Sequence, residues 1–319
     1  MSDKTRNISV LLVSFNHQKH IRQALDALIE QRFDGTIELV VADDKSTDDT
    51  LTIIREYEGK DARFAFKYLD YSENLGITKN YKRGFAACTG EYVAVLEGDD
   101  YWTSPLKLER QAEFLRDHWE SDLCSVNYFV YVEDSAQISA RVAASQGYRL
   151  ISARELIADN IVGNFSTCMY RRTALTRIPE KLFDIKSYDW ITNIVIAKST
   201  LIGFLEEPMS VYRLHGGGVW TQTPHIEKLK AQLDLLPAYD ELTEFVFHDD
   251  FEKLGSHLRH VIKVSQIGHA TEAVSQPVLR AVPAFVRYTP PIILMMLKLI
   301  VPVAVKDLLS RVLNRSRSR

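Results

Sequence analysis

The sequence lacks several features that would place it in a functional class directly. Its three cysteines, Cys88, Cys124 and Cys168, are odd in number and match no metal-ligand spacing. We therefore expect buried reduced thiols and a cytoplasmic location. The polar stretch 1–7 contains no apolar segment of the kind that a signal peptide has.

Long apolar runs are also missing. No stretch reaches the roughly 18 uninterrupted apolar residues that predict a membrane-spanning helix. The nearest candidate, 290–305, contains Lys298 and is interrupted by Pro302, and charged sequence follows up to Arg319. Residues 290–319 therefore predict either a helix lying on a membrane surface, peripheral at the inner face of the cell membrane, or a C-terminal helix packed on the domain.

The net charge and the positions of the glycines argue against further classes of protein. With 39 basic and 42 acidic residues, the net charge of −3 gives no indication of a nucleic-acid partner. The turn after the first predicted strand reads SFNHQKH and contains no glycine. A dinucleotide-binding dehydrogenase would carry G-x-G-x-x-G there, and a nucleotidyltransferase would usually have a glycine-rich basic loop.

The chain is long enough for one large α/β domain with an appendage, or for two domains. Apolar runs typical of buried strands alternate with segments of helical periodicity, and this predicts parallel βαβ units in a doubly wound, mainly parallel sheet flanked by helices. The predicted strands are 8–14, 37–42, 64–69 and 92–96, and the helices between them are 20–31, 48–58 and 78–88.

The second half of the chain is less regular. From about residue 223 onward the pattern is helical only. Before that point we expect helices at 106–117, 152–158 and 188–198, strands at 123–133 and 166–170, a polar surface loop at 134–147, and an extended segment at 202–214 interrupted by Pro208.

Acidic residues follow two of the predicted strands. Asp43 and Asp44 come after the second, and Glu97, Asp99 and Asp100 come after the fourth. Ligands of such sheets bind beyond the carboxyl ends of the strands. Because crowded carboxylates repel one another, a divalent cation such as Mg²⁺ or Mn²⁺ would stabilise this turn. The alternative is simple capping of the next helix, for which one aspartate would be enough.

Two later positions also offer chemistry. Asp189 lies among aromatic residues just before a helix, where it is either a general base or a helix cap. His215 follows Arg213 and precedes glycines 216–218. A neutral imidazole there is a candidate ligand for a divalent metal and Arg213 for a phosphate, although a lone histidine is more often structural.

These elements occur in an order that resembles the family 2 glycosyltransferases, which have the GT-A fold. The resemblance covers about residues 7–220. It rests on the segments VLLVSFNHQKHIRQAL, VVADDKSTDDT, SENLGITKNYKRGFAACTGEYVAVLEGDDYW, YDW and SVYRLHGGG. It implies a GT-A domain over 1–220, with a nucleotide-sugar half at 1–105 and an acceptor half at 106–220. The helical pattern beyond it predicts a helical C-terminal extension over 221–319, which the resemblance does not cover.

The resemblance also implies an activity. Such an enzyme would be an inverting, metal-dependent transferase using Mn²⁺ or Mg²⁺. It would move a sugar from a nucleotide-diphosphate sugar, by default a UDP-sugar, to a hydroxyl of a glycan or lipid-linked saccharide in surface-polysaccharide assembly. A non-catalytic scaffold subunit with the same fold, and a transferase acting on a polyprenyl phosphate, remain open alternatives.

The same resemblance assigns roles to individual residues. On the nucleotide side, Val13 would contact the base through its main chain and Asp44 through its side chain, and Asn74 and Lys79 would line the nucleotide pocket. Asp99 and Asp100 would form the acidic metal motif, with Asp100 as the direct ligand and His215 joining the metal or diphosphate site. Asp189 would be the general base.

The sequence departs from the family pattern at two positions. Glu97 replaces an aspartate at the start of the acidic motif, so its role is open. Lys45 replaces the glycine of the turn after the second strand. This replacement is tolerated easily only if Lys45 does not need a positive φ angle.

Overall fold

The computed structural model describes residues 7–70, 72–185, 189–217 and 223–272. Within them, 7–217 and 234–257 belong to one compact unit, and 223–233 and 258–272 belong to another. The first unit holds the sheet and every residue of the candidate site described below.

The elements lie close to their predicted positions. The strands are β1 (Asn7–Ser14), β2 (Thr36–Asp43), β3 (Phe64–Tyr68), β4 (Tyr92–Glu97), β5 (Tyr101–Trp102), β6 (Ser121–Val132), β7 (Gln137–Ala140), β8 (Tyr148–Ile151), β9 (Cys168–Arg171) and β10 (Leu201–Leu214). The α-helices are α1 (Ile21–Ile29), α2 (Thr50–Arg55), α3 (Ile77–Ala87), α4 (Lys107–Asp117), α5 (Ala153–Ala158), α6 (Arg172–Leu175), α7 (Asp189–Ile196), α8 (His225–Leu242) and α9 (His248–Glu272). Three short 3₁₀ helices are η1 (Glu133–Ser135), η2 (Phe165–Thr167) and η3 (Glu180–Asp184).

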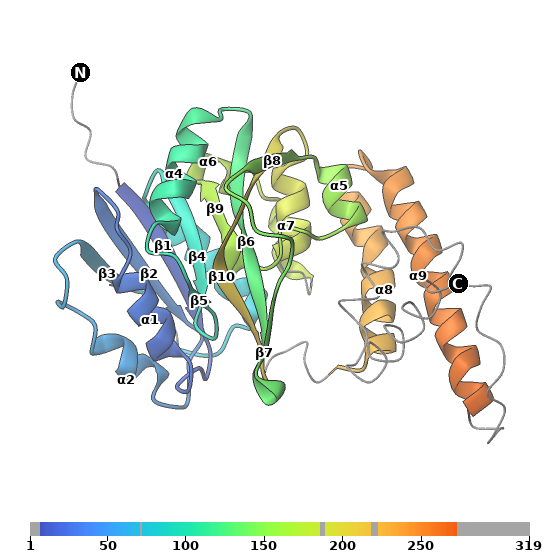
Figure 1. Cartoon of the computed structure of the whole chain (residues 1–319), viewed down its shortest axis with the longest axis horizontal. Helices are drawn as coiled ribbons and strands as arrows, with labels where there is room; N and C mark the ends of the chain where they lie inside the picture. Colours follow the sequence, from blue (N-terminus) through green and yellow to red (C-terminus); the bar gives the residue numbers. More distant parts are fainter. Residues whose placement is uncertain (1–6, 71, 186–188, 218–222, 273–319) are drawn as a thin grey trace, which may run out of the picture. The chain divides into compact units, whose positions relative to one another are not determined.

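The strands form one ten-stranded sheet in the order β3-β2-β1-β4-β9-β6-β10-β5, with β7 beside β6 and β8 beside β10. Strands β1 to β4 pair in parallel, as do β6 and β10. Because β9 is antiparallel to both β4 and β6, these two strands also run in the same direction. Six of the described strands therefore end at one edge. This confirms the predicted α/β class with a mainly parallel sheet flanked by helices (Figure 1).

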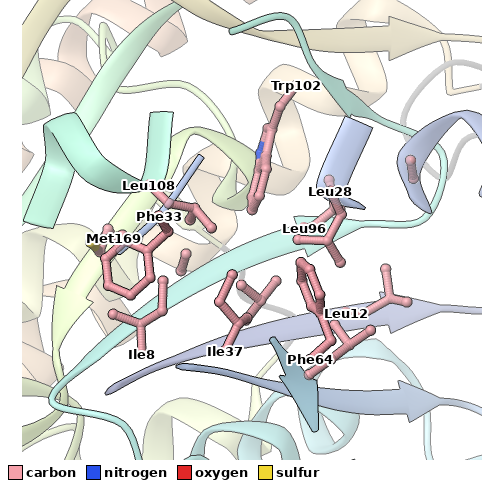
Figure 2. Close-up of a cluster of buried hydrophobic side chains, with 14 of the residues drawn as sticks. Ile8, Leu12, Leu28, Phe33, Ile37, Phe64, Leu96, Trp102, Leu108 and Met169 are labelled. Atoms are coloured by element: carbon pink, nitrogen blue, oxygen red, sulfur yellow. The ribbon is translucent and has the colours of Figure 1, made fainter. Parts of the chain in front are cut away.

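One apolar core lies between the sheet and helices α1, α2 and α4. Alternate residues of β1, Ile8, Val10 and Leu12, are buried in it, as the two-residue period of a strand requires. Leu28 of α1 and Leu108 of α4 belong to the same cluster (Figure 2). The helical period predicted for both segments therefore places their apolar faces against the sheet.

Helix α3 covers the other face. A Cβ atom on Gly84 would lie 2.5 Å from Cδ1 of Leu11, so the glycine allows α3 to pack directly on β1. Tyr81 and Phe85 of α3 pack against Phe165, with ring centroids 4.3 and 5.9 Å apart. Since both faces of the sheet are buried, its central strands are continuous apolar runs rather than alternating ones.

Two sequence expectations for the second half of the chain were wrong. The polar segment 134–147, predicted as a surface loop, contains η1 and strand β7, which pairs antiparallel with β6. All four residues of β7 are exposed, so the strand carries no apolar alternation that could reveal it. Pro208 does not interrupt β10. The strand continues through it with a shift of register on either side.

The turn after β2 holds Lys45 in a backbone conformation that is unfavourable for a residue with a side chain. Lys45 adopts a φ of 66°, in the left-handed region, as does Asn16 at 56° in the turn after β1. The side chain of Asn16 accepts a hydrogen bond from the Thr47 N–H at 2.8 Å, and the Asn16 N–H donates to Oγ of Ser46 at 2.8 Å. These bonds join the two turns, and they hold Lys45 in a conformation that costs about 1 kcal/mol for a residue with a Cβ.

Two global expectations concern thiols and membranes. Cys88, Cys124 and Cys168 are buried and unpaired, as predicted. No helix among the described residues has both the length and the apolar character needed to cross a bilayer. The segment 290–319, for which a membrane surface was one expectation, lies outside the described residues.

A lysine is fully buried in the core. Lys107 donates from Nζ to Oε1 of Gln111 at 2.7 Å, and Nζ lies 4.3 Å from the centroid of the Trp102 ring. Burial lowers the pKa of Lys107 to about 7. In the unfolded chain the pKa of this lysine is about 10.4. Between pH 7 and that value the unfolded state therefore binds more protons than the folded state. Lys107 therefore destabilises the fold fully below pH 7, and this penalty decreases as pH rises toward about 10.

Replacement of Lys107 by methionine should stabilise the protein. We expect Lys107→Met to raise the free energy of unfolding by about 1–3 kcal/mol at pH 6, and by less at pH 9. Denaturant unfolding at the two pH values measures both numbers. The exposed Lys253→Met in α9 is the control and should change stability little at either pH. A destabilised Lys107→Met at pH 6 would contradict this account.

Candidate active site

The carboxyl edge of the sheet gathers the predicted site residues from distant parts of the chain. The turn after β2 brings Asp44, the turn after β4 brings Glu97, Asp99 and Asp100, and the end of β10 brings His215. They meet because β1, β2, β4, β6 and β10 all end there.

Asp44 organises the segment before α3. It is buried, and its two carboxylate oxygens accept hydrogen bonds from the N–H groups of Leu75 and Gly76, each at 2.9 Å. Asn74 donates from Nδ2 to the carbonyl of Asp44 at 2.8 Å. Asp44 and Asn74 thus lie in contact, while Lys79 lies exposed in the first turns of α3, and the nucleotide pocket that the resemblance assigns to them stays a prediction.

Val13 lies at the end of β1 beside the acidic turn. Its carbonyl accepts a hydrogen bond from the Gly98 N–H at 2.9 Å. The Val13 side chain is buried. The contact that the structure shows for its main chain is therefore with the neighbouring turn, and this bond fixes the turn next to β1.

Glu97 at the end of β4 and Asp100 in the turn after it are held by several hydrogen bonds. Glu97 accepts hydrogen bonds from the Tyr81 hydroxyl at 2.7 Å and from Nδ2 of Asn164 at 3.0 Å. Asp100 accepts from the hydroxyl of Ser166 at 2.7 Å and also from Asn164. Burial, with the neighbouring acidic charges adding to it, raises the pKa of Glu97 well above its usual range and that of Asp100 to about 7.

Asp99 is the more open carboxylate, with 23% of its side chain exposed. Its Oδ2 lies 3.0 Å from Nε2 of His215 and 3.7 Å from Nε2 of His17. Burial alone would raise the pKa of Asp99. The hydrogen bond with His215 and the charges of both histidines outweigh it, so the pKa lies below its ordinary value. The same hydrogen bond raises the pKa of His215.

The glycine of the acidic turn makes room for His17. A Cβ atom on Gly98 would lie 2.8 Å from Nδ1 of His17, so only a residue without a side chain fits there. Nδ1 of His17 is buried and has no hydrogen-bond partner among the described residues. The turn after β1 therefore faces the acidic turn with an imidazole packed directly against it.

Arg213, which the sequence offered as a phosphate contact, instead braces the acidic turn. Its N–H donates to Oδ1 of Asp100 at 2.9 Å, and Nε donates to the carbonyl of Asp99 at 2.8 Å. Its Nη2 donates to Oε1 of Gln23 on α1 at 2.6 Å. The side chain is buried, and these three bonds tie β10 to the turn after β4 and to α1.

Asp189 begins α7, and its Oδ1 accepts a hydrogen bond from the Trp190 N–H at 2.5 Å. Burial raises the pKa of Asp189 to about 7. Its charge contributes to the raised pKa values of Glu97 and Tyr212, so Asp189 lies within electrostatic range of the acidic turn. Asp189 thus stands at a helix start, and its role as general base stays a prediction.

The aromatic residues near these motifs are mainly structural. Trp102 is buried and donates from Nε1 to the carbonyl of Ser166, and Trp190 donates to the carbonyl of Leu156, both at 2.9 Å. Tyr188 and Trp220 lie outside the described residues.

Sequence reasoning missed four residues of the site. His17 and Gln23 belong to the turn and helix after β1, so their place at the carboxyl edge was accessible from the predicted strand order. No sequence pattern indicated Asn164 and Ser166, because the antiparallel pairing of β9 with β4 brings them to the acidic turn. No local motif predicts that pairing.

Comparison with known proteins finds relatives of this chain. An uncharacterised protein of Mycobacterium tuberculosis is 36% identical over 213 residues, which are 67% of this chain and 60% of that protein. The chain therefore matches only about 60% of the length of this relative.

Two solved structures share the fold. TarS of S. aureus in complex with UDP aligns with a TM-score of 0.54 at 19% identity, over 77% of this chain and 72% of the TarS chain. The mannosyltransferase PcManGT of Pyrobaculum calidifontis, in complex with GDP-Man and Mn²⁺, aligns with a TM-score of 0.54 at 15% identity, over 86% and 82%. At these identities the likeness shows the GT-A fold itself.

The family model for glycosyl transferase family 2 matches residues 9–178, more than half of the 319 residues. This range includes most of β1, all of β2 to β4, the acidic turn and the Asn164–Ser166 segment that holds it. The chain therefore belongs to glycosyl transferase family 2.

Proposed function

We propose that this chain is an inverting transferase that moves a sugar from a nucleoside-diphosphate sugar to an acceptor hydroxyl. One observation carries the proposal: the partly exposed carboxylate of Asp99 lies next to His215 at the edge where the parallel strands end, and the charge of a second carboxylate, Asp189, reaches the same acidic turn. This arrangement would supply a cation site for a diphosphate and a separate base for an acceptor.

The donor atoms present fit a divalent cation. Three carboxylates crowd the turn after β4, and burial together with their mutual charges raises the pKa of two of them. A cation would relieve this repulsion. Asp99 is partly exposed, whereas Asp100 already accepts three hydrogen bonds. Asp99 and His215 would therefore hold the ion, and Asp100, which the resemblance favoured as the direct ligand, would support them. When bound, such an ion neutralises the leaving diphosphate.

Asp189 would accept the proton of the acceptor hydroxyl as that oxygen attacks the anomeric carbon from the face opposite the diphosphate. A single displacement inverts the anomeric centre and needs no carboxylate nucleophile. On the donor side, Asp44 and Asn74 would hold the nucleotide with the main chain of Val13, and Lys79 would be its exposed cationic neighbour. The acceptor is proposed to be a glycan or lipid-linked saccharide.

The donor can be identified without knowing the acceptor. We expect the purified chain to hydrolyse one nucleotide sugar slowly with Mn²⁺ or Mg²⁺ and not with EDTA, because water replaces the acceptor. The panel includes UDP- and GDP-sugars, since the TarS and PcManGT structures hold one of each kind of nucleotide. If no donor is hydrolysed and no nucleoside diphosphate raises the melting temperature, the chain is a scaffold rather than a transferase.

Removal of the proposed base should separate chemistry from binding. We expect Asp189→Asn to lower turnover by about 10²–10⁴-fold while nucleotide affinity, measured by calorimetry with Mn²⁺, changes little. Asp184→Asn, an exposed aspartate just upstream, is the control and should keep full turnover. Near-normal turnover in Asp189→Asn would show that another group is the base.

The pH dependence tests the same base independently. A general base acts when ionised, and burial raises the pKa of Asp189 to about 7. With donor and metal saturating, turnover should therefore fall roughly tenfold per pH unit below about 7 and level off above it. A flat profile between about pH 5.5 and 7 would be incompatible with this role.

A further inference from the structure

A pocket lies between α4, β8 and β10, apart from the residues of the proposed transfer site. It encloses about 230 Å³. Its walls include Glu113 and Phe114 of α4, His118 directly after that helix, Tyr148 of β8 and Leu205 of β10. The proposed mechanism uses none of these side chains, so the pocket needs an explanation of its own.

The pocket is remote from the carboxyl edge of the sheet. Strand β8 pairs with residues 202–205 of β10, whereas β7 pairs with the end of β6 that lies beside residues 211–214 of β10. Figure 1 shows β8 and β7 at opposite ends of these long strands. Leu205 comes eight residues before Arg213, roughly 26 Å along the strand. A small molecule in the pocket therefore does not reach the acidic turn.

Three aromatic rings form one wall of the pocket. The rings of Phe114 and His118 stack, with centroids 4.2 Å apart and an angle of 18° between their planes. Tyr148 stands steeply to both, with centroid distances of 5.3 and 4.9 Å. Tyr148 is 51% exposed, and Trp119, the residue after His118, is 85% exposed. Because large aromatic residues are mostly buried, exposed rings beside a pocket indicate a surface that a ligand covers.

Polar groups with unused hydrogen-bonding capacity line the same pocket. The carboxylate of Glu113 is half-buried and forms neither a hydrogen bond nor an ion pair with the described residues. The hydroxyl of Tyr148 has no hydrogen-bond partner among them either. Nδ1 of His118 lies 2.8 Å from Oε1 of Glu120. Since a carboxylate only accepts, Nδ1 carries the proton of the neutral ring and Nε2 is left as an acceptor.

Most of the charges around the pocket are paired. Nη2 of Arg110 lies 2.7 Å from Oε2 of Glu207. Both oxygens of Asp117 accept hydrogen bonds from Arg116, at 2.9 and 3.2 Å. Within the described part of the chain, Glu113 is thus left as the unpaired carboxylate of the wall. An ionic ligand would meet little net charge here, so the pocket favours a neutral ligand with hydroxyl groups.

A sugar ring has the chemistry that this wall offers. Its C–H groups form an apolar face, which packs on an aromatic ring because the face of that ring is electron-rich. Its hydroxyls both donate and accept, so they can donate to Glu113 and to His118 and exchange hydrogen bonds with Tyr148. The volume is below the roughly 300–1,000 Å³ of pockets for drug-sized ligands, which fits one ring rather than a long chain.

We propose that this pocket binds one sugar ring, packed against Tyr148 and hydrogen-bonded to Glu113. The site is separate from the transfer site. That the ring belongs to the acceptor glycan rests on the proposed function above. A glycan held here by one unit would have its free end at a raised effective concentration near the carboxyl edge.

The experiment uses the full chain in EDTA without nucleotide, so that no metal-bound donor contributes to sugar binding. The probes are the methyl glycosides of glucose, galactose, mannose and N-acetylglucosamine, and saturation-transfer NMR reports their binding. We expect at least one to bind with a Kd of roughly 1 mM, because a single ring makes few contacts. Tyr148→Ala and Glu113→Gln should each weaken that binding about 5–10-fold. Glu113→Gln keeps the side-chain size, so it remains a valid test if Tyr148→Ala disturbs β8.

Two variants outside the pocket are matched controls. Phe245→Ala removes an exposed aromatic ring, and Glu91→Gln neutralises an exposed carboxylate. Both should leave the binding unchanged. Three results would overturn the proposal: no glycoside binds, the pocket variants bind as well as the wild type, or UDP with Mn²⁺ displaces the bound glycoside. Preferred binding of tetramethylammonium would also overturn it and assign the pocket to a cation.

Failure of this inference and failure of the proposed function give different results. A chain that hydrolyses a donor but binds no glycoside in EDTA retains the function and lacks the sugar pocket. A chain that binds a glycoside through Tyr148 and Glu113 but hydrolyses no donor has the pocket without the activity. If both hold, Tyr148→Ala should leave slow donor hydrolysis unchanged, because Tyr148 lies outside the proposed transfer site.

Discussion

The turn after β4 depends on the interactions that hold its carboxylates together. Glu97 and Asp100 are crowded, and they stay in place because Tyr81, Asn164, Ser166 and the Arg213 main chain donate hydrogen bonds to them. These four donors come from three separate segments of the chain. The helix α3, the segment before β9 and the strand β10 are therefore all fixed around one acidic turn, and Asp99 is left as its open member.

Chemically similar aspartates have different surroundings in this arrangement. Asp44 and Asp100 accept several hydrogen bonds each and act first as fixed points of the scaffold. Asp99 is more exposed and lies between two imidazoles, so it is free to meet a ligand. Asp189 is set apart by burial, which raises its pKa to about 7 and makes it suited to accept a proton near neutral pH.

Three histidines place imidazole rings next to the carboxylates at the carboxyl edge of the sheet. His17 and His215 flank Asp99, and His20 packs edge to face on His215. Gly98 permits the first of these contacts because a side chain there would collide with His17. The turn after β1, which in the sequence shows only the absence of glycine, thus places imidazole nitrogens in a region otherwise rich in carboxylate oxygen.

The sequence by itself determined the alternation of strands and helices, and it indicated the carboxyl edge as the place where Asp44, Asp99 and Asp100 gather. These follow from local periodicity and from the rule that parallel strands end together. Asp189 and His215 were assigned roles only by the resemblance to the family. Only the tertiary structure decided which carboxylate stays open, that Arg213 is a brace, and that Asn164, Ser166, His20 and Glu133 reach the same edge. The reason is physical: burial, charge and hydrogen bonding depend on neighbours brought in by β6, β9 and β10, whose pairing no local pattern records.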